Sequence, residues 1–160
     1  MMKRKIYNEM LLWKQNAQGK SALMIDGARR IGKSYIVEEF AKNEYKSYIL
    51  VDFNNADDNL IEIFDKYLRN LDVFFSYLAL YYNVTLYPRD TVIVFDEVQL
   101  YPKARAAIKY LVKDGRYDYI ETGSLVSINR NVKDIVIPSE EHRINMYPMD
   151  FEEFLRAVGD

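Results

Sequence analysis

The sequence predicts an α/β protein with a five-stranded, mainly parallel sheet and helices on both of its faces. Short apolar runs alternate with amphipathic helical stretches along the 160 residues, and this order is typical of a parallel sheet. The run at residues 91–96 is almost wholly apolar without alternation, as expected of a strand that is covered on both faces. A glycine turn joins the apolar run at residues 21–26 to a helical stretch, so we expect a ligand site at the carboxyl edge of the sheet.

The individual elements follow from hydrophobic periodicity and from turn residues. The expected strands cover residues 21–26, 45–53, 91–96, 117–121 and 143–147. The expected helices cover a leading segment at residues 1–19, then residues 33–42, 102–113 and 150–158, with two shorter helices between the second and third strands. Asp72 is expected to cap the second of these shorter helices. The fourth strand is expected to lie between the first and the third, which makes this an additional-strand type of sheet.

The two shorter helices carry apolar stripes that are rich in aromatic residues. The first stripe consists of Leu60, Ile61, Phe64, Leu68 and Leu71, and the second of Phe74, Tyr77, Leu78 and Tyr81. Aromatic side chains can also stack on the bases of single-stranded nucleic acid. The helical spacing of both stripes favours the core instead.

Composition limits both the organisation of the chain and its chemistry. With 49% hydrophobic residues, the chain is expected to form one domain over residues 1–160, with residues 1–20 as a helical lead-in. There is no cysteine, which excludes thiol nucleophiles, and with His142 as the single histidine zinc clusters and Ser/His/Asp triads are nearly excluded. The net charge of -2 indicates no overall basic field, so nucleic acid is expected as a partner only through a longer protein.

The sequence also bears on the compartment. Neither end resembles a signal peptide, and no apolar stretch approaches the roughly 18 residues that a membrane span needs. We therefore expect a cytoplasmic protein without a membrane partner.

A phosphate-binding loop is the strongest motif in the chain. The expected nucleotide-binding residues are Gly27, Ala28, Arg29, Arg30, Ile31, Gly32, Lys33, Ser34 and Tyr35, of which the first eight fit G-x-x-x-x-G-K-[ST]. Glycines at these positions let backbone N–H groups approach a phosphate at the start of a helix. Lys33 is expected to reach the β- and γ-phosphate oxygens of ATP, and Ser34 to bind Mg²⁺.

An acidic pair follows the apolar run at residues 91–96. Asp96 is the expected second protein partner of Mg²⁺, and Glu97 is the expected general base for the attacking water. The alternative is a pair of solvated carboxylates at the end of a strand. The acidic pair follows the loop lysine and lies on a separate strand, and this position favours the catalytic interpretation.

Two further catalytic candidates rest on weaker patterns. Ser124, or else Thr122, follows the fourth strand and is expected to contact the γ-phosphate or the water, although an ordinary turn explains the pattern equally well. Arg143 is our choice for a charge-stabilising arginine, with a surface ion pair as its alternative. The other arginines considered for this role are Arg29, Arg30, Arg116 and Arg130.

Four phrases together resemble a prokaryotic AAA-like ATPase family: IDGARRIGKS, VFDEVQ, ETGSL and YPMDFEEFL. The resemblance covers nearly the whole chain, and the phrases at residues 96–99 and 147–154 are its most specific parts. It implies an N-terminal ATPase part followed by a winged-helix segment and a nuclease-like C-terminal domain beyond Asp160. Two departures are Ala28, where the family commonly has proline, and His142, where it has glycine before Arg143.

The expected function is hydrolysis of Mg-ATP to ADP and phosphate, weakly in this chain alone, as the motor or switch of a larger protein. We expect a missing arginine to come from self-association or from a C-terminal domain. The first alternative is an ATP-gated binding module with negligible turnover. A GTPase is disfavoured because the N-K-x-D signature is absent, the segment at residues 131–134 reading N-V-K-D. A small-molecule kinase is disfavoured because no arginine-rich lid is found.

Overall fold

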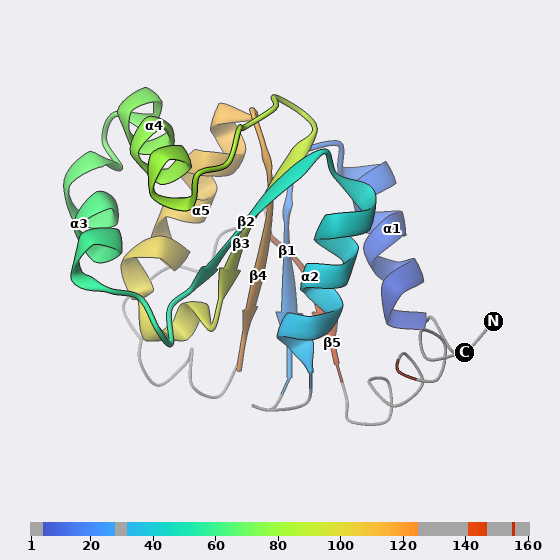
Figure 1. Cartoon of the computed structure of the whole chain (residues 1–160). Coiled ribbons are helices and arrows are strands. Elements are labelled where there is room, and N and C mark those ends of the chain that lie inside the picture. The colour runs from blue at the N-terminus through green and yellow to red at the C-terminus, as the bar shows by residue number, and fades with distance from the viewer. Residues whose placement is uncertain (1–4, 28–31, 125–140, 147–154, 156–160) are drawn as a thin grey trace.

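The computed structural model describes residues 5–27, 32–124, 141–146 and 155, and its core is a single five-stranded sheet (Figure 1). The strands are β1 (Ala22–Asp26), β2 (Ser47–Asp52), β3 (Thr91–Asp96), β4 (Asp118–Gly123) and β5 (Glu141–Asn145). Their spatial order is β2-β3-β4-β1-β5, and all the described strand pairs are parallel. The predicted fold class is therefore confirmed, including the position of β4 between β1 and β3.

Helices cover both faces of this sheet (Figure 1). They are α1 (Lys5–Ala17), α2 (Lys33–Glu44), α3 (Asp58–Tyr67), α4 (Leu71–Tyr82) and α5 (Pro102–Asp114), with the short 3₁₀ helix η2 (Val98–Leu100) before α5. One hydrophobic cluster joins the sheet to α1 and α2, and a second joins it to α3, α4 and α5. Within the described ranges, no helix is long and apolar enough to cross a membrane.

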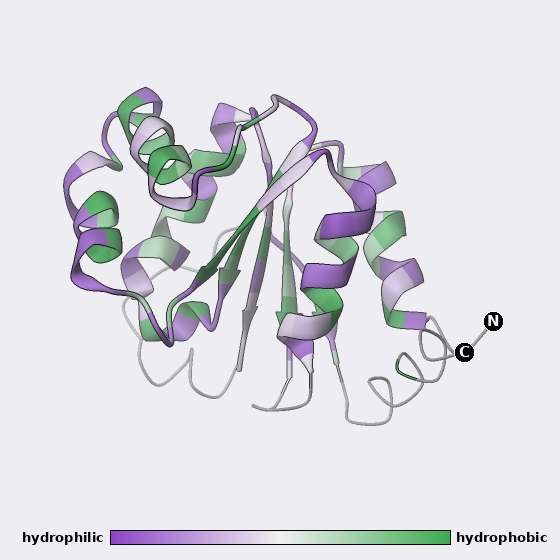
Figure 2. Ribbon diagram, in the orientation of Figure 1, coloured by the Kyte–Doolittle hydropathy of each residue, from purple (hydrophilic) through white to green (hydrophobic). Residues whose placement is uncertain are grey.

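The central strand β3 shows why the sheet is buried on both faces. Its six residues are all buried. Because side chains alternate along a strand, Val92 and Val94 pack in the α1/α2 cluster, whereas Ile93 and Phe95 pack in the opposite cluster. Figure 2 shows β1 and β3 as largely hydrophobic, while the helices alternate between hydrophilic and hydrophobic residues.

The register of the strands brings their carboxyl ends to one edge. Asp26 at the end of β1 is paired with Gly123 at the end of β4. In the neighbouring pair of strands, Phe95 of β3 is paired with Glu121 of β4. Loops that follow these strands therefore begin close together, which positions the site described below.

Two details of the α3/α4 pair differ from the sequence prediction. The cap of α4 is Asn70, whose side chain accepts a hydrogen bond from the N–H of Val73, so the prediction of Asp72 is wrong. Tyr77 and Tyr81 are 43% and 39% exposed, because the buried side of α4 is formed by Phe74, Phe75 and Leu78 instead.

Element ends differ as well. β4 extends two residues beyond the predicted end, so that Thr122 and Gly123 belong to the strand and do not follow it. β5 begins at Glu141 and ends at Asn145, earlier than predicted. The helix predicted at residues 150–158 lies almost wholly outside the described residues, as does the phrase at residues 147–154.

Candidate nucleotide-binding site

Lys33 is the first residue of α2 and lies buried at the carboxyl edge of the sheet. The preceding Gly32 has φ 86° and ψ 17°, a left-handed conformation that glycine adopts without steric cost. The Lys33 Nζ donates hydrogen bonds to the carbonyl oxygens of Gly27 at 2.6 Å and Gly123 at 3.3 Å. Lys33 therefore reaches from the start of α2 to the ends of both β1 and β4. Residues 28–31 of the predicted loop lie outside the described residues.

The surroundings of Lys33 suit an anionic ligand. Its exposed fraction is only 3%, and this burial lowers the pKa of its ammonium group, opposed by the carboxylates of Glu97, Asp26 and Asp96. Among the described residues, no side chain caps the N-terminus of α2. The first N–H groups of a helix carry a partial positive charge, so a phosphate here would meet both these groups and Lys33.

Ser34 and Asp96 meet where a divalent cation is expected. The Ser34 hydroxyl lies 2.7 Å from Oδ1 and 2.9 Å from Oδ2 of Asp96, although the two residues come from α2 and β3. Mg²⁺ in nucleotide sites prefers oxygen ligands and uses only one or two protein groups beside phosphate oxygens and waters. The hydroxyl and carboxylate present here fit that requirement.

Thr122 fixes Asp96 from the neighbouring strand β4. Its hydroxyl donates to Asp96 Oδ1 at 2.6 Å and accepts the backbone N–H of Glu97 at 2.9 Å. Burial raises the pKa of Asp96, while hydrogen bonds from Thr122 and Ser34 oppose that rise. The single proton of the Thr122 hydroxyl is thus already directed at Asp96, which makes Thr122 a support of the acidic pair.

Glu97 follows β3 directly and has an unusual backbone conformation. Its φ of 57° and ψ of 50° are left-handed, which is uncommon for a residue with a side chain. Its carboxylate lies 3.7 Å from Lys33 Nζ and accepts a hydrogen bond from Gln99 Nε2 at 2.6 Å. The sequence analysis did not identify Gln99 as a site residue, and the phrase D-E-V-Q was the one available signal.

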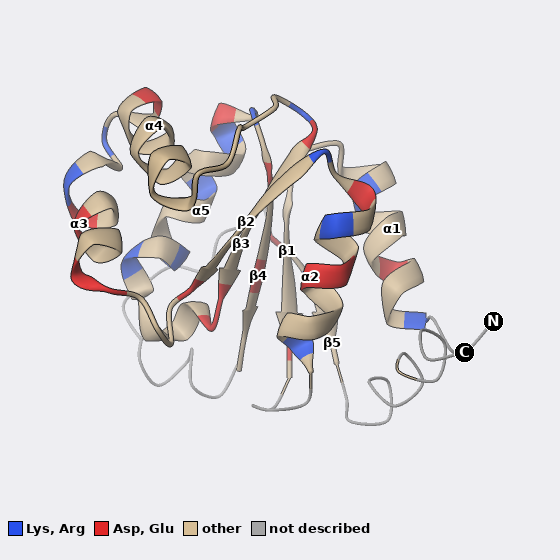
Figure 3. Ribbon diagram, in the orientation of Figure 1, with Lys and Arg blue, Asp and Glu red and all other residues tan. Residues whose placement is uncertain are grey.

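A cavity of about 650 Å³ opens beside these residues. It is lined by residues of α2, β2 and β3 and the segments after these strands: Ser34, Tyr35, Glu38, Leu50, Asp52, Asn54, Asp96 and Glu97. Figure 3 shows acidic residues at the carboxyl ends of β2 and β3 and a basic residue at the start of α2. The lining of the cavity is therefore acidic at Asp52, Asp96 and Glu97. Lys33 does not line it but lies 3.7 Å from the Glu97 carboxylate. Ser124, half-buried, follows the end of β4 next to Gly123.

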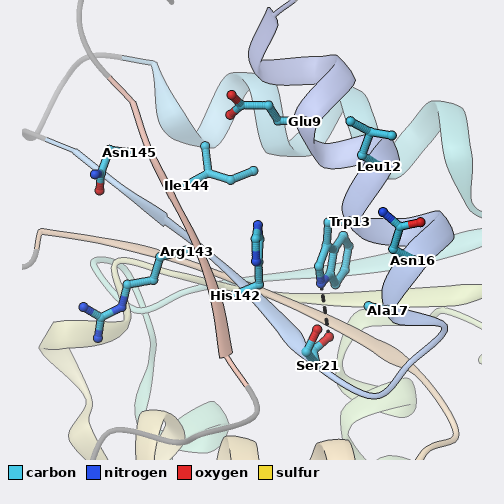
Figure 4. A pocket seen from close by; sticks show the side chains of 10 residues that line it. All are labelled: Glu9, Leu12, Trp13, Asn16, Ala17, Ser21, His142, Arg143, Ile144 and Asn145. Atoms are coloured by element: carbon cyan, nitrogen blue, oxygen red, sulfur yellow. Dashed lines mark hydrogen bonds between the residues drawn. The ribbon is translucent and has the colours of Figure 1, made fainter.

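A second cavity, of about 610 Å³, lies between α1 and β5 and lacks the residues described above. In Figure 4, His142 and Ile144 point toward α1, whereas Arg143 points to the other side of β5. The Arg143 Nε donates to Glu141 Oε1 at 3.2 Å. An ion pair on β5, the alternative considered for Arg143, is thus present.

The other arginine candidates are less informative. Arg116 pairs with Asp114 and Asp72 just before the start of β4, at the opposite edge of the sheet from Lys33. Arg29, Arg30 and Arg130 lie outside the described residues.

The strand order and the Lys33, Ser34 and Asp96 constellation define a P-loop nucleotide-binding domain with an additional central strand. A family model described as AAA domain matches residues 19–155, and the chain belongs to this family. It is accordingly a nucleotide-binding module of the ATPase type.

Other comparisons add little to this assignment. No curated protein matches the sequence. Among solved structures, the chain is similar to C. elegans PCH-2, with 10% sequence identity and a TM-score of 0.44. The similarity covers 89% of this chain and 42% of the PCH-2 chain, so this chain spans less than half of that chain's length.

Proposed function

We propose that this domain binds Mg-ATP and hydrolyses it to ADP and phosphate. The observation that carries the proposal is the meeting of Lys33, Ser34, Asp96 and Glu97 at one sheet edge, although they come from two separate segments of the chain. Lys33 and the N–H groups of the loop would hold the phosphates. Ser34 and Asp96 would hold Mg²⁺, which neutralises the charge that develops on the phosphate oxygens.

Glu97 would act as the general base. It lies beside Lys33 and therefore near the γ-phosphate that Lys33 would contact. A carboxylate 3.7 Å from the Lys33 ammonium group can orient a water molecule beside the phosphate and accept its proton. An ATP-gated binding module without turnover would need Lys33, Ser34 and Asp96 but would have no use for a carboxylate held at the position of Glu97.

We further propose that the domain is the motor or switch of a larger protein and that its hydrolysis is weak in isolation. In support, both arginine candidates within the described residues, Arg143 and Arg116, are engaged with carboxylates. A charge-stabilising arginine would then come from a second copy of the chain or from another domain. A cytoplasmic location and a nuclease-like C-terminal domain stay predictions from the sequence.

Thermal unfolding with nucleotide tests the binding step. At 100 times its dissociation constant, Mg-ATP should stabilise the domain by about 2.7 kcal/mol and so raise its Tm. Lys33→Ala should remove most of this shift because the phosphates lose their buried cation. Lys42→Ala, an exposed lysine in the last turn of the same helix, is the matched control and should keep the shift. Equal or greater stabilisation by Mg-GTP would contradict the assignment of ATP.

A further inference from the structure

We propose that Gln99 is a positioning residue that holds Glu97 in its catalytic orientation, an inference that rests on the proposed hydrolysis. The Gln99 Nε2 donates to Glu97 Oε2 at 2.6 Å, while the other carboxylate oxygen faces Lys33 Nζ at 3.7 Å. Each oxygen of Glu97 therefore has its own partner. Gln99 is itself 2% exposed, so its amide is fixed by the surrounding protein.

The chemistry of the amide supports a dedicated role. Only the NH₂ group of glutamine can donate to a carboxylate, so this contact determines which way the amide points. Its Oε1 is then buried without a hydrogen-bond partner among the described residues. A buried unsatisfied oxygen is costly, and a leucine would fill the same space without that cost. We infer that the contact with Glu97 outweighs this penalty.

Hydrogen bonds also fix the backbone from Glu97 to Leu100. The left-handed conformation of Glu97 is fixed on one side by its N–H bond to Thr122 and on the other by the bond from the Leu100 N–H to the Glu97 carbonyl at 3.0 Å. Gln99 lies in the intervening 3₁₀ turn, so its distance from Glu97 is set by the same turn. Strained residues held by several contacts are typical of functional sites.

Nucleotide binding would change the partners of the Glu97 carboxylate. A γ-phosphate would compete with Glu97 for Lys33, because both are anions that approach the same ammonium group. The Gln99 amide donates to the other oxygen of Glu97, Oε2, and would keep this bond. Gln99 would therefore still hold Glu97 in its catalytic orientation when Lys33 contacts the nucleotide.

A double-mutant cycle in ATP turnover tests the proposal. Gln99→Leu should lower kcat by about 10- to 100-fold while KM stays within twofold, because a misplaced base slows the chemical step and leaves binding intact. In a Glu97→Gln background the same change should have less than a twofold effect, since Gln99 would act through Glu97 alone. Tyr110→Ala, at an exposed residue of the following helix α5, is the control and should leave kcat unchanged. An unchanged kcat in Gln99→Leu, or losses that multiply in the double variant, would overturn the proposal.

A measurement without turnover separates this proposal from the hydrolysis on which it rests. The side-chain NH₂ signals of Gln99, assigned by their loss in Gln99→Leu, should exchange slowly with solvent in the wild-type chain and faster in Glu97→Ala. Equal exchange in both proteins would overturn the contact itself. Slow exchange together with a wild-type chain that hydrolyses no ATP would contradict the proposed function and would remove the role of Gln99 with it.

Discussion

At the residue scale, the site depends on side chains that serve two partners at once. Thr122 is the clearest example because its one hydroxyl joins Asp96 to the backbone of Glu97. It thereby ties the expected Mg²⁺ ligand to the expected base. Neither bond is visible in the sequence, since both depend on β4 lying beside β3.

Replacing Thr122 separates its hydroxyl from its shape. Thr122→Val should cost about 1–3 kcal/mol of unfolding free energy, because the N–H of Glu97 and a buried oxygen of Asp96 each lose a partner. ATP turnover should fall with it. Thr122→Ser keeps the hydroxyl and should lose less than half as much stability in urea unfolding. Equal losses in the two variants would show that the methyl group, and not the hydroxyl, matters here.

The residues of the site were predictable to different degrees. Lys33, Ser34 and Asp96 follow a spacing that the chemistry of a phosphate and a cation requires, so the sequence was sufficient to predict that Ser34 and Asp96 meet. Their roles in binding stay predictions. Gln99 was missed because a glutamine after an acidic pair has no meaning until the 3₁₀ turn brings it back to Glu97.

At the scale of elements, a buried charge cluster joins α5, β4 and β5. Arg105 contacts Glu121 at 3.2 Å and Glu141 at 2.6 Å, and all three side chains are at most 1% exposed. Burial, together with the neighbouring Glu141, raises the pKa of Glu121 well above its ordinary value. Hydrogen bonds from Glu121 and Arg105 outweigh burial at Glu141 and lower its pKa. We therefore assign the proton of this cluster to Glu121.

This assignment predicts a pH-dependent stability. Because folded Glu121 keeps a proton that the unfolded chain releases above pH of about 4.3, raising the pH from 5 to 8 should favour unfolding. Glu141, with a lowered pKa, contributes only below this range. Glu121→Gln mimics the protonated form, so the unfolding free energy of the variant should rise relative to that of the wild type as the pH is raised from 5 to 8. The unfolding free energies can be measured by urea unfolding at both pH values. Equal changes in the two proteins would contradict the assignment.

The elements themselves were predictable where one physical requirement dominates. The bounds of β3 agree with the sequence because burial on both faces demands an unbroken apolar run. The cap of α4 was misassigned because Asn70 and Asp72 are both good capping residues and lie only two positions apart. The exposed faces of Tyr77 and Tyr81 were missed because an aromatic ring can pack with its body and still reach water.

At the scale of the whole molecule, the topology brings together residues that are distant in sequence. Lys33 follows β1, Glu97 follows β3, and the carbonyl of Gly123 ends the strand between them. A parallel sheet places all these ends on one edge, so the helix that begins at Lys33 faces the acidic end of β3. The function proposed here is a property of that edge and of no single segment.

The proposed hydrolysis is tested most directly by Glu97→Gln, measured for ATP affinity and ATP turnover in the same preparation. The variant keeps the size of the side chain and removes the base, so turnover should fall by about 10² to 10⁴ while Mg-ATP affinity is retained or raised. Asp96→Asn, the matched variant at the preceding residue, should instead weaken both turnover and Mg²⁺-dependent binding. A Glu97→Gln protein that hydrolyses ATP at the wild-type rate would contradict the account, because the water would then be activated elsewhere.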